Sequence, residues 1–103
     1  MIKVSVFYPN GPQAKFDMDY YCKQHIPLVQ RLVGTALKAT AVEKGLTGAV
    51  PGLAPSFIAL GHLTFDSVES FQASFAVNSK EIVADVPNYT NTQPVIQVSE
   101  IMI

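Results

Sequence analysis

The sequence has few of the features that mark a metalloprotein, a nucleic-acid-binding protein or a membrane protein. Its 103 residues include one cysteine, Cys22, which excludes an internal disulfide and a metal site built from several cysteines. Only 15% of the residues are charged, and seven Lys and Arg against eight Asp and Glu give a formal charge of −1. No basic surface for nucleic acid is therefore predicted. No apolar run approaches about 18 residues, so no membrane-spanning segment is predicted.

The first ten residues, MIKVSVFYPN, also lack the pattern of a secretory leader. They alternate like a strand and hold no basic segment followed by an apolar run. We therefore expect no signal peptide and a cytoplasmic protein. Cys22 has no nucleophile signature around it and is expected to be a small apolar side chain of the core.

What the chain has in quantity is apolar side chains, at 49% of all residues with a mean hydropathy of +0.25. A chain of this length forms a single core, so residues 1–103 are predicted to be one domain. The same composition leaves apolar surface that a partner subunit can cover.

The spacing of apolar residues predicts four strands and two main helices in the order β-α-β-β-α-β. Strands are expected at 2–8, 36–46, 56–65 and 92–103, and helices at 17–34 and 66–78, with a short extra helix at 79–86. Asp66 and Glu69 are expected to cap the second helix. This order is that of the α+β ferredoxin-like fold, one antiparallel sheet with two helices on one face. Because the strands are apolar on both faces, we predict a homodimer packed through the open sheet face.

His25 is the candidate catalytic residue. A helical wheel over 17–34 puts it on the apolar face, with Met18, Tyr21, Leu28, Val29 and Leu32. Burial favours the neutral ring, which can act as base, acid or hydrogen-bond donor. The alternative is a core histidine satisfied by a backbone carbonyl.

Pro27 falls on the polar face of the same predicted helix, two residues after His25. It cannot donate a hydrogen bond to the carbonyl of Lys23, and its ring pushes that carbonyl away. The result is either simple curvature around the sheet or a bend that sets the direction of His25.

Two further candidates come from strand position. Tyr8 ends the first strand near the start of the first helix, where it can share a pocket with His25. The predicted strand at 56–65 has a Phe-rich face, which includes Phe57 and suits packing against helices. His62 lies on the opposite face. His62 is therefore expected either inside a cavity of the dimer or exposed at a strand end. Neither histidine has a partner at metal-ligand spacing, so no metal and no cofactor are predicted.

The polar loop ADVPNYTN, residues 84–91, supplies Asp85 and Tyr89. Such a loop either lines the mouth of a pocket or forms turn hydrogen bonds with its own backbone.

Two stretches, FDMDYYCKQHIPLV and DVPNYTNTQPVIQVSEI, resemble the EthD family of small proteins. The acid and aromatic positions of the family pattern fall here on Asp19, Tyr20 and Tyr21, and its His-x-Pro-Leu motif begins at His25. The later Asp-x-Pro-Asn-Tyr-Thr pattern falls on residues 85–90. The segment LTFDSVESFQASF is also similar to the family. The resemblance implies a dimeric α+β barrel made of two ferredoxin-like chains, and it gives weight to His25 and Asp85. Relatives in the same superfamily include cofactor-free muconolactone isomerases and polyketide-modifying oxygenases, an analogy of fold alone.

Three functions are open at this point. The first is a cofactor-free enzyme for a small hydrophobic cyclic metabolite, with isomerase, dehydratase, lactone-type or oxygenase-like chemistry. In it His25 is the general acid/base, and the substrate is oriented by Tyr8, Tyr21, His62, Asp85 and Tyr89. The second is a binding or accessory protein of such a pathway. The third is a structural dimer without a cavity.

Overall fold

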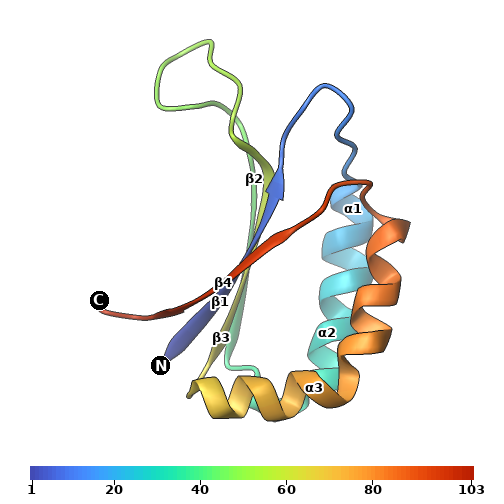
Figure 1. Ribbon diagram of the computed structural model, residues 1–103, viewed down its shortest axis with the longest axis vertical. Coiled ribbons are helices and arrows are strands. Elements are labelled where there is room, and N and C mark those ends of the chain that lie inside the picture. Colours follow the sequence, from blue (N-terminus) through green and yellow to red (C-terminus); the bar gives the residue numbers. More distant parts are fainter.

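Four strands form one antiparallel sheet, and all the helices lie on one of its faces (Figure 1). The computed structural model describes residues 1–103. The strands are β1 (Ile2–Pro9), β2 (Ala39–Lys44), β3 (Phe57–Phe65) and β4 (Val95–Glu100), in the sheet order β2-β3-β1-β4. Each pair of neighbouring strands is antiparallel, as the sequence predicts.

The helical segments follow β1 and β3. The first consists of α1 (Met18–Tyr20), the π-helical turn η1 (Tyr21–His25), α2 (Ile26–Val33) and the 3-10 turn η2 (Gly34–Ala36). The second consists of α3 (Val68–Asp85) and the 3-10 turn η3 (Val86–Asn88). The β-α-β-β-α-β order of a ferredoxin-like α+β fold is therefore confirmed. None of these helices combines the length and apolar character needed to cross a membrane.

The second helix differs from the prediction at its start and in its length. Residues 79–86 do not form a separate helix, because α3 runs unbroken to Asp85. The helix is capped by Ser67 rather than Asp66, since the Ser67 hydroxyl accepts the backbone N–H of Ser70 at 3.0 Å. Asp66 lies one residue outside that position and pairs with Lys38 at 3.7 Å.

The core between sheet and helices has two parts. One is mainly aliphatic and lies toward the α2–α3 crossing; its buried members are Ile2, Val4, Val29, Val33, Leu63, Phe65 and Ile82. The other is aromatic and lies toward α1 and η1; its buried members are Tyr8, Tyr21, Ile26, Ala59 and Tyr89. The aromatic part contains three tyrosines, one each from β1, η1 and the loop after η3, and they bring hydroxyl groups into the interior.

The prediction for one end of β3 is wrong. The pairing of β1 with β3 shifts at Tyr8 and Pro9, which face Ala59 and Phe57 and leave Ile58 without a partner on β1. The shift reverses the alternation, so Ile58 packs against the aromatic part of the core. Phe57 turns to the open face of the sheet, where its ring lies 5.2 Å from that of Phe7.

The open face of the sheet is apolar at one end and polar toward its middle. Phe7 pairs with Leu60 on β3 and with Val95 on β4, so these three share the face with Phe57. Further along, Ser5 pairs with Gln97 on β4 and with His62 on β3.

Candidate functional site

The helix that carries His25 widens by one residue at η1. The backbone N–H of Ile26 donates to the carbonyl of Tyr21, five residues back instead of four. Pro27 follows directly, has no N–H and cannot pack against the carbonyl of Lys23 in a regular α-helix. A π-turn beside the proline removes this conflict, and such turns are frequent at functional sites.

The π-turn moves the buried face of the helix by one position. Tyr21 and His25 are buried as the wheel predicts, but the stripe continues through Ile26, Val29 and Val33. Leu28 and Leu32, which the wheel places on the buried face, are only partly buried. The extra residue rotates everything after it by about 100°, which a wheel of constant pitch cannot represent.

His25 is anchored by a carboxylate. Its Nδ1 lies 2.8 Å from Oδ2 of Asp85, the last residue of α3. The other oxygen of Asp85 accepts the hydroxyl of Tyr20 at 2.7 Å and the amide of Asn88 at 2.9 Å. The backbone-satisfied alternative is thereby replaced by a His–Asp pair that a tyrosine and an asparagine hold in place.

The pair sits in an environment that sets its charges. Burial lowers the pKa of His25 below its ordinary value of 6.5, although Asp85 opposes the shift. Burial alone raises the pKa of Asp85, but the hydrogen bonds from Tyr20, Asn88 and His25 together outweigh it, so that pKa lies below its ordinary value of 3.8. At neutral pH the pair is thus a carboxylate and a neutral imidazole. The Nδ1–H donates to Asp85, and Nε2 keeps its lone pair.

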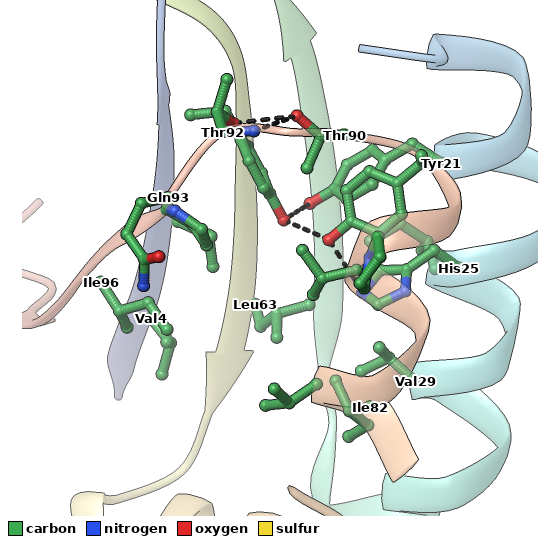
Figure 2. A pocket seen from close by; sticks show the side chains of 18 of the residues that line it. Val4, Tyr21, His25, Val29, Leu63, Ile82, Thr90, Thr92, Gln93 and Ile96 are labelled. Carbon is green, nitrogen blue, oxygen red and sulfur yellow. Dashed lines mark hydrogen bonds between the residues drawn. The ribbon is translucent and has the colours of Figure 1, made fainter. Parts of the chain in front are cut away.

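Three tyrosine hydroxyls continue from Nε2 into the interior. The hydroxyl of Tyr89 lies 3.4 Å from Nε2 of His25 and 2.8 Å from the hydroxyl of Tyr8, which lies 3.4 Å from that of Tyr21. Figure 2 shows this chain as dashed lines between sheet and helix, ending at the His25 ring. Burial raises the pKa of all three phenols, so each keeps its proton at neutral pH.

The ring of Tyr21 depends on a glycine of β3. A Cβ on Gly61 would collide with the Tyr21 hydroxyl. Gly61 faces the helices between the buried Ala59 and Leu63, where a side chain is otherwise expected. The Tyr21 hydroxyl occupies the space that a side chain at position 61 would fill.

These groups line one end of a cavity of about 550 Å³ between the sheet and the helices. Fourteen of its 21 lining residues are hydrophobic, among them Val4, Val29 and Leu63. No Lys, Arg, Asp or Glu lines it. Figure 2 shows Gln93 and Ile96 across the cavity from His25. The volume lies within the range of about 300–1,000 Å³ that is usual for small-molecule sites.

The structure brings together most of the residues that the sequence predicts for the site. Tyr8, Tyr21, His25 and Tyr89 line the cavity. Asp85 does not line it and acts on His25 from behind.

His62 does not line the cavity that holds His25, and it lies on the open face of the sheet, as strand alternation predicts. There its Nδ1 lies 2.9 Å from the Ser5 hydroxyl and its Nε2 3.0 Å from Glu43.

Cys22 is not a core residue either. It is exposed on the first helix, 3.7 Å from the sulfur of Met18. No three side chains of His, Cys, Asp or Glu are grouped closely enough to share a metal ion.

The 84–91 loop lines the cavity, and its polar side chains also bind a separate segment of the chain. Tyr89 turns inward, while Thr90 donates to the carbonyl of Lys15 at 2.7 Å and Asn91 accepts the backbone N–H of Lys15 at 2.8 Å. These bonds fasten the loop to the segment that leads into the first helix, so His25 and Tyr89 are held in one frame.

Tyr20 and Gly61 belong to the candidate site in the structure, but the sequence did not assign them to it. Tyr20 stands in the family pattern beside Tyr21, but nothing in the sequence tells that it reaches Asp85, 65 positions away. Gly61 interrupts an apolar strand, and such a glycine is a signal of close approach by another group.

The comparisons with known proteins establish the family and the fold. Residues 11–93 match the model of the EthD domain. The crystal structure of an EthD-like protein from Ralstonia eutropha JMP134 superposes with a TM-score of 0.95 at 42% sequence identity, covering 99% of this chain and 92% of that one. The chain belongs to the EthD family.

More distant structures share the fold of this EthD family member. An ethyl tert-butyl ether D family protein from Bacillus halodurans C-125 has a TM-score of 0.75 at 20% identity, with 99% of each chain covered. A dimeric ferredoxin-like protein of unknown function from Thermobifida fusca YX has a TM-score of 0.58 at 14% identity, covering 97% of this chain and 90% of that one. No curated protein matches the chain.

Proposed function

We propose that this EthD family member is a cofactor-independent enzyme that moves protons on a small hydrophobic cyclic molecule. The observation that carries the proposal is the setting of His25. Its Nδ1 is tied to Asp85, while its Nε2 lies beside Tyr89 at the wall of an apolar cavity. A neutral imidazole that is oriented by a carboxylate is the usual form of a general base.

In the proposed step, Nε2 removes a proton from the ligand. A C–H or O–H bond breaks, its electron pair stays on the ligand, and an N–H bond forms on His25. Asp85 stabilises the resulting imidazolium and acts as a positioning residue. The hydroxyls of Tyr89 and Tyr8 donate to the ligand oxygen on which negative charge develops.

Return of the proton completes the reaction without any oxidant or reductant. If His25 gives it to another atom of the same ligand, the ligand is isomerised. If it goes to a departing hydroxyl group, the product is an alkene and water, which is a dehydration.

The test measures proton exchange on a simple cyclic ketone, 2-tetralone, in D₂O by ¹H NMR. The protein is expected to accelerate the loss of the signals next to the carbonyl, and His25→Gln is expected to lower this acceleration by roughly 100-fold or more. The control is His62→Gln, which changes a histidine of the opposite sheet face. Thermal unfolding verifies that both variants are folded. Full exchange in folded His25→Gln contradicts the proposal.

A non-catalytic binding or accessory protein is the second candidate. It is favoured by the pairing of the cavity's polar groups with one another, since the Tyr89 hydroxyl already lies 2.8 Å from that of Tyr8 and 3.4 Å from Nε2 of His25. The same experiment separates the two, because a binding protein is stabilised by 2-tetralone without exchanging its protons.

We also propose that two chains pair through the open sheet face. The apolar end formed by Phe7, Phe57, Leu60 and Val95 supports this pairing, since a helix covers none of these side chains. The dimeric ferredoxin-like protein from Thermobifida fusca shares the fold.

A further inference from the structure

We infer that the cavity takes an uncharged, largely hydrocarbon ligand with one oxygen group, and that it rejects the carboxylate of the same shape. This inference rests on the proposed function only in taking the cavity as the ligand site. It concerns the chemical class of the ligand, which the His–Asp pair alone does not define.

The first support is the absence of a counter-charge. No Lys or Arg lines the cavity, so a carboxylate or phosphate entering it would lose its water without gaining a cationic partner. The only side chain there that can become a cation is His25, and burial lowers its pKa. Burial of an unpaired charge is strongly unfavourable.

The second support is the position of the nearest charge, the carboxylate of Asp85. It stands behind His25 and is occupied by Tyr20, Asn88 and His25 itself. It therefore adds a negative potential to the inner end of the cavity. This potential opposes an anion, while the carboxylate offers no free oxygen to a cationic ligand.

The third support is that the polar groups of the cavity gather at one end. The hydroxyls of Tyr8 and Tyr89 are neutral donors, and Nε2 of His25 is a neutral acceptor. Toward Val29 and Ile82 the wall is hydrocarbon, as Figure 2 shows. Such an arrangement fits a ligand with a carbonyl or hydroxyl at one end and a hydrocarbon body.

The test compares four probes of one shape at neutral pH by isothermal titration calorimetry and thermal shift: naphthalene, 2-naphthol, 2-naphthoate and 2-naphthylmethylammonium. Binding of 2-naphthol is expected to exceed that of naphthalene by roughly two- to tenfold, the value of one net hydrogen bond. It is expected to exceed that of either ion by roughly 100-fold or more. Equal binding of 2-naphthoate and 2-naphthol overturns the inference, as does a failure of both uncharged probes to bind.

A variant with an added cation gives a second test. It measures the change in affinity for 2-naphthoate between variant and wild type, whatever the wild-type affinity is. Gln93 is exposed and lines the cavity opposite His25, so Gln93→Lys supplies the missing counter-charge without disturbing the core. We expect this variant to gain affinity for 2-naphthoate by roughly 10- to 100-fold. The matched control is Gln72→Lys, at an exposed position of α3 that does not line the cavity.

An unchanged affinity of Gln93→Lys for 2-naphthoate, or an equal gain in Gln72→Lys, counts against the inference. These binding results are separate from the proposed function. If 2-naphthol binds selectively while 2-tetralone is not exchanged, the ligand class stands and the enzyme proposal fails.

Discussion

His25 has partners at both ring nitrogens, and neither partner is a backbone group. Asp85 fixes Nδ1 at 2.8 Å, and Tyr89 lies 3.4 Å from Nε2. The tighter bond decides which nitrogen carries the proton, because a carboxylate accepts and cannot donate. The lone pair on Nε2 at neutral pH thus follows from the position of Asp85 at the end of α3.

At the residue scale we predict that the free energy of unfolding decreases as the pH is lowered, because the folded chain resists protonation of the His25 ring. Its folded pKa lies below 6.5, so between that pKa and 6.5 the unfolded chain binds a proton that the folded chain does not. The stabilisation is therefore present above pH 6.5 and is lost as the pH falls through this window. Asp85, whose pKa is also lowered, adds a loss in the same direction below its ordinary value of 3.8.

Urea unfolding from about pH 8 to about pH 5 measures this dependence as the change in the free energy of unfolding. An NMR titration of the His25 ring gives its pKa directly. In His25→Gln the slope near pH 6 is expected to become shallower. A ring pKa at or above 6.5 would disprove the assignment of a neutral base.

Two elements meet at the site through departures from regular geometry. The π-turn η1 adds one residue to the helix, and Tyr21, His25 and Ile26 around it all face the core. Opposite it, Gly61 opens β3 for the Tyr21 hydroxyl. The helix supplies the extra residue, and the strand omits a side chain.

At the element scale we predict that Gly61→Ala destabilises the protein and disturbs the tyrosine chain. The new Cβ overlaps the Tyr21 hydroxyl, and overpacking of this kind costs about 1–3 kcal/mol in the free energy of unfolding. Urea unfolding measures the cost. The control is Gly11→Ala, where a Cβ would have no atom within 4 Å.

The double variant Gly61→Ala, Tyr21→Phe tests the cause of this cost. Removing the hydroxyl removes the main overlap, so the two changes together are expected to cost less than the sum of the single changes. Additive costs would show that Gly61 is required for another reason, such as the backbone of β3.

The molecule as a whole has two different sheet faces. The helices cover one and enclose the cavity, while the other holds an apolar end beside the Ser5–His62–Glu43 contacts. β4 lies at one edge of the sheet, and two of its side chains, Val95 and Ile96, are each 56% exposed. A single chain thus leaves apolar strand surface uncovered.

At the scale of the whole molecule we predict that Leu60→Glu dissociates a homodimer. Leu60 lies on the open face at the apolar end, so a buried carboxylate there would have no partner. Light scattering after gel filtration measures the mass. The matched control is Val77→Glu, at a residue of α3 that is 83% exposed and expected to keep the wild-type mass. A wild-type monomer, or an unchanged mass in both variants, rules out this interface.

The sequence by itself determined the order of elements and the family, and it predicted a single domain and a role for His25. It did so because apolar periodicity is a local property and because the His-x-Pro-Leu pattern lies within one helix. It also predicted that Tyr8 shares a pocket with His25 and that Asp85 and Tyr89 orient the substrate there.

Only the tertiary structure decided how these residues act. The partnership of His25 with Asp85 joins positions 60 residues apart, and the contacts of His62 with Ser5 and Glu43 join three different strands. The widened turn before Pro27 shifts the buried stripe by one residue, so no fixed helical period predicts it. A site of this kind depends on distances between elements, and those are set when the sheet and helices pack.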